Sequence, residues 1–240
     1  MFKRNKNKLT DLNKKRVLVT HEMPKSTISE QYRMIRSNID FSSIDEQIRT
    51  LVFTSAAPSA GKSTTAANVA VAYAQARKSV LLIDGDLRKP TIHYTFETNN
   101  VFGLSNLISN QVDMDNAIKM TEIENLSILT SGPIPPNPSE LLGSDRMEDL
   151  LSAFLERFDM VIIDTPPVLA VTDAAILSKL VDGTILVTDI EINNKNHIIK
   201  TKEILVNANA NLLGIILNNV KGNKKDDYYY YNYYGEKNNE

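Results

Sequence analysis

The fold of this chain is decided by residues 50–64, which read TLVFTSAAPSAGKST. Thr50–Ser55 is a short apolar, β-branched run, and the loop after it reaches Gly61, Lys62 and Ser63 just before a helical pattern. A strand, a loop of small residues and a helix that opens with Lys-Ser form the context of a phosphate-binding P-loop. In such a loop, backbone N–H groups and the helix N-terminus attract phosphate oxygens. The stretch therefore predicts a nucleotide-binding α/β fold.

Seven consecutive loop residues are expected to bind the nucleotide. They are Pro58, Ser59, Ala60, Gly61, Lys62, Ser63 and Thr64. In a P-loop the lysine contacts β and γ phosphate oxygens and the hydroxyl ligates Mg²⁺, so Lys62 and Ser63 take these roles. The pattern normally begins with glycine, where this chain has Ala56. Asn223–Asp226 matches the NKxD pattern of guanine-specific GTPases but does not directly follow a strand. We therefore expect ATP and Mg²⁺, with Asn218 or Asn219, at the end of the last strand, as the candidate contact to adenine.

Five more apolar, β-branched runs indicate further buried strands. With the first, they are Thr50–Ser55, Ser79–Asp84, Leu126–Thr130, Met160–Asp164, Thr184–Asp189 and Leu212–Asn218. Helical patterns separate most of them: Ser63–Ala76, Asp145–Phe158, Thr172–Leu180 and Asn196–Val206. Because the runs are continuously apolar, as in strands covered on both faces, we predict an α/β fold with a mostly parallel central sheet flanked by helices on both faces. Ligands of such sheets bind beyond the carboxyl ends of the strands.

Three carboxylates stand at the ends of two of these runs. Asp84 and Asp86 follow one run and Asp164 follows another. An Asp at the end of a buried strand can hold the hydration shell of Mg²⁺, although each alone is as often a cap or turn residue. Beside a P-loop they indicate a catalytic set, which is Lys62, Asp84, Asp86 and Asp164. The predicted metal ligands are Ser63, Asp86 and, through water, Asp164.

Composition is that of an ordinary globular protein. Apolar residues make up 42%, and the net charge of −2 gives no reason to expect a nucleic-acid partner. The chain has no cysteine, which excludes disulfides and thiolate metal sites. No stretch is apolar and long enough to span a membrane, so we expect a cytoplasmic protein. We divide the chain into a basic N-terminal segment (1–25), one domain (26–220) and a C-terminal tail (221–240). The basic segment is either a solvated tail or a contact to an anionic membrane surface.

A further helix is predicted over Ser26–Phe41, before the first strand. Glu30, Arg33 and Arg36 are spaced three apart and form a charged stripe on it. For a lone helix, the simplest interpretation of such a stripe is a solvated face with local ion pairs.

Six of the nine tyrosines gather within seven positions of the tail: Tyr228, Tyr229, Tyr230, Tyr231, Tyr233 and Tyr234. One interpretation is an aromatic, strand-forming segment. The other is a cluster of phosphoryl acceptors. From Val220 to Tyr234 the extended chain spans about 45 Å, enough to reach a neighbouring active site. Asp84 is then the predicted acceptor of the tyrosine proton, and its role and that of Asp86 are interchangeable at this stage.

Taken together, these motifs resemble the bacterial tyrosine kinases (BY-kinases) of capsule and exopolysaccharide systems, in their cytoplasmic Gram-positive form. The resemblance covers the chain from Ser26 to the tail. Its parts are the P-loop, the Walker A′ motif at Leu81–Arg88, the Walker B motif at Val161–Asp164, the Glu-x-x-Arg-x-x-Arg stripe and the tyrosine cluster. The related MinD and ParA ATPases carry a signature lysine where this chain has Ala57. This departure counts against an ATPase switch without kinase activity, which is the alternative function.

The resemblance implies an assembly and a setting. Glu30, Arg33 and Arg36 would form the interface of a ring in which each tail docks in the next subunit's site. A separate transmembrane activator would complete the nucleotide site and recruit the protein to the inner face of the plasma membrane. Autophosphorylation between subunits would loosen the ring and regulate polysaccharide synthesis and export, and other proteins are possible further substrates.

Overall fold

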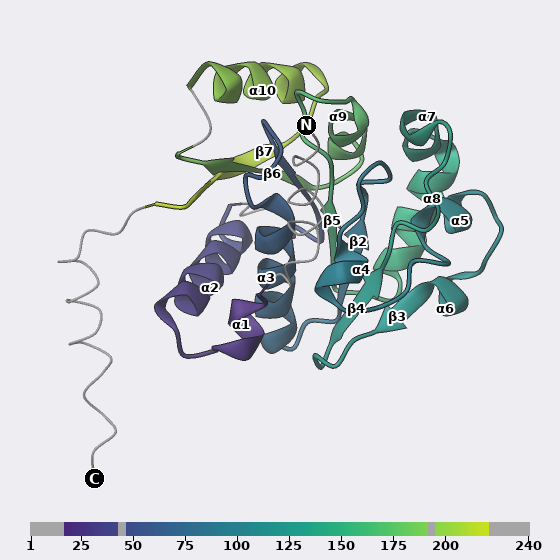
Figure 1. Ribbon diagram of the computed structural model, residues 1–240, viewed down its shortest axis with the longest axis horizontal. Coiled ribbons are helices and arrows are strands. Elements are labelled where there is room, and N and C mark those ends of the chain that lie inside the picture. The colour runs from purple at the N-terminus through teal and green to yellow at the C-terminus, as the bar shows by residue number, and fades with distance from the viewer. Residues whose placement is uncertain (1–16, 43–46, 192–194, 221–240) are drawn as a thin grey trace, which may run out of the picture.

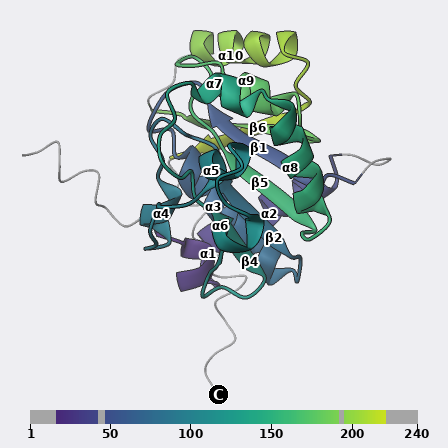
Figure 2. The same cartoon turned by 90° about the vertical axis from the view of Figure 1, so that its right-hand side faces the viewer.

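The computed structural model describes residues 17–42, 47–191 and 195–220. A seven-stranded sheet in the order β3-β4-β2-β5-β1-β6-β7 forms its centre. The strands are β1 (Thr50–Ser55), β2 (Val80–Asp84), β3 (Ile118–Met120), β4 (Leu126–Leu129), β5 (Met160–Asp164), β6 (Gly183–Asp189) and β7 (Leu212–Asn218). All neighbours pair in parallel except β3, which runs antiparallel to β4 at one edge. The predicted mostly parallel sheet is thus confirmed, and Figure 2 shows β6, β1 and β5 lying side by side.

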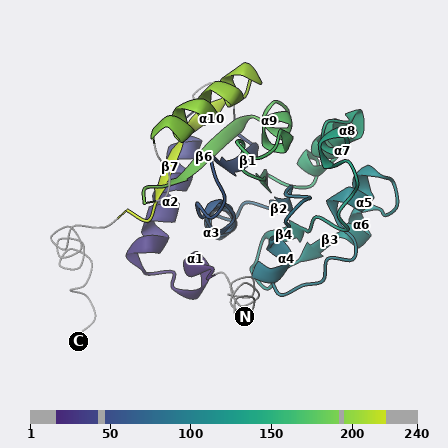
Figure 3. The same ribbon diagram turned by 45° about the horizontal axis from the view of Figure 1, so that its top comes forward.

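Helices cover both faces of this sheet (Figures 1 and 3). The longer helices are α2 (Thr27–Asp40), α3 (Lys62–Gln75), α8 (Asp145–Leu155), α9 (Asp173–Ser178) and α10 (Lys195–Asn207). The shorter ones are α1 (Val19–Glu22), α4 (Ile92–Thr95), α5 (Leu104–Ile108), α6 (Met114–Ala117) and α7 (Pro138–Leu142). Helix α3 lies on one face with α1 and α2 beside it, and α5, α7, α8 and α9 lie on the other.

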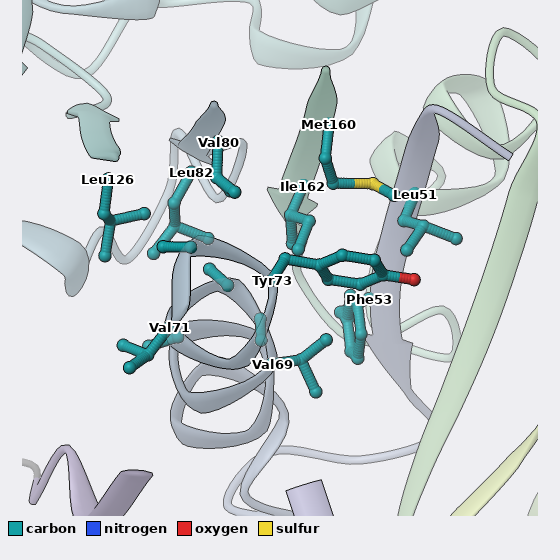
Figure 4. Close-up of a cluster of buried hydrophobic side chains, with 14 of the residues drawn as sticks. Leu51, Phe53, Val69, Val71, Tyr73, Val80, Leu82, Leu126, Met160 and Ile162 are labelled. Atoms are coloured by element: carbon teal, nitrogen blue, oxygen red, sulfur yellow. The ribbon is translucent and has the colours of Figure 1, made fainter. Parts of the chain in front are cut away.

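The central strands are apolar throughout because successive side chains enter two different cores. Along β1, Leu51 and Phe53 point to the α3 side, whereas Val52 points to the α8 side. Figure 4 shows the α3 side, where Tyr73 of α3 lies beside Phe53 and the side chains of β5. The Tyr73 hydroxyl donates to Asp40 Oδ1 at 2.8 Å, which links α3 to the end of α2. Burial on both faces explains why these strands could be predicted from continuous apolar runs.

The predicted elements are confirmed, with ends that differ by a few residues, and several short elements were missed. No pattern in the sequence predicts β3 or the short helices α1, α4, α5, α6 and α7. The segment 17–25, which composition groups with the basic N-terminus, contains α1, and its Leu18 is buried in the core on the α3 side. Most of the basic segment and the whole tail lie outside the described residues. Within the described residues, no helix is long and apolar enough to cross a membrane.

Candidate functional site

The P-loop lies between β1 and α3 in a conformation that needs small residues. Ser59 and Gly61 both have positive φ, 66° and 85°, and α3 begins at Lys62. A Cβ on Gly61 would lie 2.1 Å from Asn218 Nδ2, so both the backbone angle and the space require glycine here. Asn218 also donates from Nδ2 to the Ala60 carbonyl at 3.1 Å. The predicted adenine contact therefore lies against the loop, at the carboxyl end of β7.

Lys62 connects the P-loop to the acidic strand ends. Its Nζ lies 3.0 Å from Asp164 Oδ1, 3.8 Å from Asp86 Oδ2 and 3.1 Å from Ser63 Oγ. The strands β2 and β5 pair so that Asp84 and Asp164 are register partners, which places the two carboxylates side by side. The parallel sheet therefore brings together Lys62, Asp84, Asp86 and Asp164, which the sequence predicts as a catalytic set.

Asp84 is buried and holds the loop that follows β2. Its Oδ2 accepts from the backbone N–H groups of Thr91 and Ile92 at 2.8 and 2.9 Å, and its Oδ1 accepts from that of Asp86 at 3.3 Å. Burial, together with the charge of Asp164, raises the pKa of Asp84 to about 7. At neutral pH this carboxyl group is therefore close to the midpoint of its titration.

Asp86 is oriented differently from Asp84. Its Oδ1 accepts from the backbone N–H groups of Lys89 and Arg88, while its Oδ2 is the oxygen nearest Lys62. Burial raises the pKa of Asp86 as well. One carboxylate oxygen of Asp86 thus secures the loop and the other faces the lysine.

The arrangement fits a magnesium nucleotide. Asp164 is buried, and its Oδ2 has no hydrogen-bond partner among the described residues. A buried carboxylate oxygen without a partner is costly unless a ligand, ion or water satisfies it. No group of three or more His, Asp or Glu side chains in the described part of the chain is placed to hold a metal by itself. Mg²⁺ commonly binds one or two protein groups together with phosphate oxygens and water, and the unpaired Asp164 Oδ2 is one such group.

Comparisons with known proteins identify the family. The model of an AAA domain matches residues 48–213. The putative tyrosine-protein kinase CapB of Staphylococcus aureus is 48% identical over 219 residues, which cover 91% of this chain and 95% of CapB. Tyrosine-protein kinase YwqD of Bacillus subtilis (strain 168) is 48% identical over 216 residues, which cover 90% of each chain. This chain belongs to the bacterial tyrosine-protein kinase family.

Solved structures agree with this family. The chimerical protein CapA2B2 matches the kinase with a TM-score of 0.83 and 51% identity, covering 85% of this chain and 90% of that one. The septum site-determining protein MinD of Pyrococcus horikoshii OT3, complexed with Mg-ADP, is more distant, with a TM-score of 0.60, 27% identity and coverage of 70% and 69%. The predicted BY-kinase resemblance and the MinD-related fold are confirmed, and the relatives favour the kinase over the ATPase switch. Membership of this P-loop family also implies nucleotide binding with a divalent metal in general.

The kinase contains an ion pair beside the site that sequence reasoning missed. Arg88 Nε and Nη2 donate to Asp173 Oδ2 and Oδ1 at 2.8 and 3.0 Å, and Ser139 Oγ donates to the same Asp173 Oδ1 at 2.7 Å. From the sequence alone, Arg88 is equally well a contact to the acidic tail or a solvated residue. In the structure Arg88 ties the Walker A′ loop to α7 and α9, and its contact to the acidic tail remains a prediction. The partners are 85 positions apart in the chain, so no local pattern identifies the pair.

The predicted stripe of the kinase lies on α2 with partners in its own chain. Arg33 pairs with Glu30 and donates to the Pro24 carbonyl at 2.7 Å. Arg36 donates to the Ala72 carbonyl at 2.8 Å, near the end of α3. The oligomer interface predicted for these residues remains a prediction. The tyrosine cluster predicted as the acceptor lies outside the described residues.

Proposed function

We propose that the kinase transfers the γ-phosphoryl group of Mg·ATP to the tyrosines of its own C-terminal cluster, between subunits. The observation that carries the proposal is the position of Lys62, which lies at the start of α3 within 3.8 Å of carboxylates from two strand ends. A cation held there by acidic groups can turn to the phosphates when a magnesium nucleotide enters. The family, named for tyrosine kinases, supplies the class of acceptor.

Each residue of the site has a proposed role. Backbone N–H groups of residues 58–64 hold the phosphates, and Lys62 stabilises the charge of the transferring group. Ser63, Asp86 and Asp164 hold the metal, Asp164 through water. Bound Mg²⁺ would neutralise charge on the phosphate oxygens. Asn218 contacts the adenine, because its amide lies beside the loop at the end of β7.

The proton of the attacking tyrosine goes to a carboxylate of the Walker A′ motif. A pKa of about 7 makes Asp84 a suitable base at neutral pH. Against this, backbone groups already bond both of its oxygens, whereas Asp86 Oδ2 faces Lys62. We propose that Asp84 accepts the tyrosine proton and that Asp86 acts chiefly as a metal ligand. The variants Asp84→Asn and Asp86→Asn distinguish these two roles. Loss of a metal ligand raises the Mg²⁺ concentration needed for turnover, whereas loss of a base changes the pH profile of turnover.

The assembly and its setting are also proposals. The name of the chimerical protein CapA2B2 combines two protein names, which supports a partner for the kinase, and the resemblance identifies that partner as a transmembrane activator. We propose that subunits assemble into a ring through Glu30, Arg33 and Arg36 at the inner face of the plasma membrane. Phosphorylated tails would loosen the ring and so regulate the synthesis and export of capsular or extracellular polysaccharide.

Intact-mass spectrometry after incubation with Mg·ATP tests the activity. The kinase is measured with and without the cytoplasmic segment of an activator, beside Lys62→Met and beside a variant with all six cluster tyrosines changed to Phe. Successive phosphate additions that map to residues 228–234 and vanish in both variants are expected. Turnover of ATP without added mass, even with the activator segment present, would identify an ATPase switch instead.

A further inference from the structure

A groove of about 980 Å³ runs between α2 and β7 at one edge of the sheet. Figure 1 shows α2 and α10 on opposite sides of β7, and α2 packs on α3 rather than on this strand. Large apolar side chains of both elements lie exposed along the groove: Ile28, Met34, Ile215, Leu217 and Val220. The groove is therefore an apolar surface beside a strand that pairs on one side only.

The edge strand β7 lacks the charged residues and proline that commonly prevent pairing, although its pairing with β6 contains a register shift. Edge strands are commonly blunted by charged residues or proline. The sequence of β7 is LLGIILN, with neither. The described residues that line the groove also include no Asp, Glu, Lys or Arg, although hydroxyl and amide groups such as those of Thr27, Gln31 and Asn38 are present. An uncharged groove with scattered hydrogen-bonding groups fits side chains that have an apolar body and a polar tip.

We propose that the unphosphorylated tyrosine cluster of the same chain docks in this groove as an added strand along β7. The chain enters the tail from Val220, which itself lines the groove. Residues 221–227 then provide about 23 Å of extended chain and include Gly222–Asn223, a pair suited to a turn. The cluster covers seven positions, and β7 has seven residues. A tethered segment also has an effective concentration in the millimolar range, which favours it over a second molecule.

The chemistry of the cluster matches the groove. Tyrosine has a high strand propensity, and its ring buries apolar area while the hydroxyl reaches a polar partner. Phosphorylation adds about −1.5 to −2 charges to each modified tyrosine. The described residues that line the groove offer such a group no counterion, so phosphorylation should expel the tail. This second step rests on the proposed kinase activity, whereas the docking itself does not.

Hydrogen–deuterium exchange of the β7 amides tests the docking on the full chain without nucleotide. The wild type is compared with a serine variant, in which all six cluster tyrosines, Tyr228 among them, are changed to Ser. This variant keeps the full length of the tail. Docking should slow exchange of the β7 amides not paired with β6 by about tenfold in the wild type. The slowing should be independent of protein concentration, since the tail binds its own chain.

Two matched substitutions distinguish an effect of charge in the groove from the effect of an added surface charge elsewhere. Met34→Lys introduces a charge in the groove, and Met120→Lys introduces the same charge on β3 at the opposite edge of the sheet, where Met120 is 90% exposed. We expect only Met34→Lys to raise β7 exchange to the level of the serine variant. Equal exchange in wild type and serine variant overturns the proposal, and protection that grows with concentration assigns the tail to a second copy, which also overturns it.

A third arm adds Mg·ATP to the wild type and follows mass and exchange together. Added phosphate should raise β7 exchange to the level of the serine variant, and a phosphorylated tail that still protects β7 overturns the release step. If no phosphate is added even when the cytoplasmic segment of an activator is present, the kinase proposal fails for this chain, whereas the first two arms still decide the docking.

Discussion

Removing Arg88 and removing Asp173 from their ion pair should lower the free energy of unfolding by different amounts. Asp173 is fully buried, whereas 37% of the Arg88 side chain is exposed. Arg88→Ala leaves a buried carboxylate with Ser139 as its remaining side-chain partner, while Asp173→Ala leaves a guanidinium that can turn to water. We therefore expect Arg88→Ala to destabilise the kinase more than Asp173→Ala does.

The magnitudes follow from what is left behind. Removing one partner of a buried pair costs about 3–5 kcal/mol, and the bond from Ser139 places Arg88→Ala near the lower end, at about 3 kcal/mol. Asp173→Ala loses the hydrogen bonds and the favourable charge at the start of α9, but it also removes a desolvated carboxylate, so we expect about 1 kcal/mol. The double variant should cost about 2 kcal/mol less than the sum of the two single variants.

Urea unfolding at about pH 7.5 measures all four proteins in one cycle. For a chain of this size, about 3 kcal/mol corresponds to a fall in Tm of roughly 6–12 °C, so thermal unfolding provides a second measurement. Equal losses for the two single variants, or additive losses in the double variant, would refute the argument from unequal burial. Arg88→Lys is an informative companion, because it keeps the charge but loses the two-pronged hydrogen bond.

Three more predictions concern the site and its support. In the metal-free and nucleotide-free protein, a pKa raised from 3.8 to about 7 means that the Asp84 carboxyl group contributes stability below about pH 4 that is lost as the pH rises to about 7. The stability of Asp84→Asn relative to wild type should therefore rise between about pH 4 and pH 8, by up to about 4 kcal/mol in urea unfolding, and a difference that does not change with pH would contradict this. Asn68→Ala removes the oxygen that accepts from the buried Thr20 N–H at 2.9 Å. The loss should lower the free energy of unfolding by about 2–3 kcal/mol and speed amide exchange in residues 17–23. Unchanged exchange there would show that Asn68 does not anchor this segment. Gly61→Ala should abolish nucleotide binding in calorimetry and lower the stability by about 1–3 kcal/mol through its positive φ. Adding Asn218→Ala should relieve only the clash between the new Cβ and the Asn218 side chain. Wild-type affinity in Gly61→Ala would rule out the assigned loop geometry.

Much of the fold could be predicted because its determinants are local. Six strands appear in the sequence as continuous apolar runs, most of them because they are buried on both faces, and the P-loop is a contiguous motif whose residues act where they stand. The antiparallel β3 has only three residues with an exposed end at Met120, so no apolar run marks it. Helices of four or five residues likewise have too few turns for a periodic pattern.

Contacts between distant segments could not be predicted from any local pattern. Asn68 within α3 holds the backbone of Thr20 and Val17, and this anchors residues that by composition belong to a basic, polar N-terminus. The groove beside β7 also depends on the arrangement of segments that are distant in the sequence. It depends on how far α2 stands from the sheet, and amphipathic spacing within α2 does not fix that distance.

The electrostatics of the site also arise from pairing rather than from the motifs. Sequence spacing identifies Asp84 and Asp164 one at a time, but the register of β2 with β5 makes them neighbours and leaves Lys62 between several carboxylates. The charge of Asp164 disfavours the ionised form of Asp84, and Asp164 Oδ2 lacks a partner among the described residues. We therefore expect the site to be stabilised when a further cation binds beside these carboxylates. A magnesium nucleotide that neutralises these groups binds only the folded chain, so its binding energy should stabilise the whole domain.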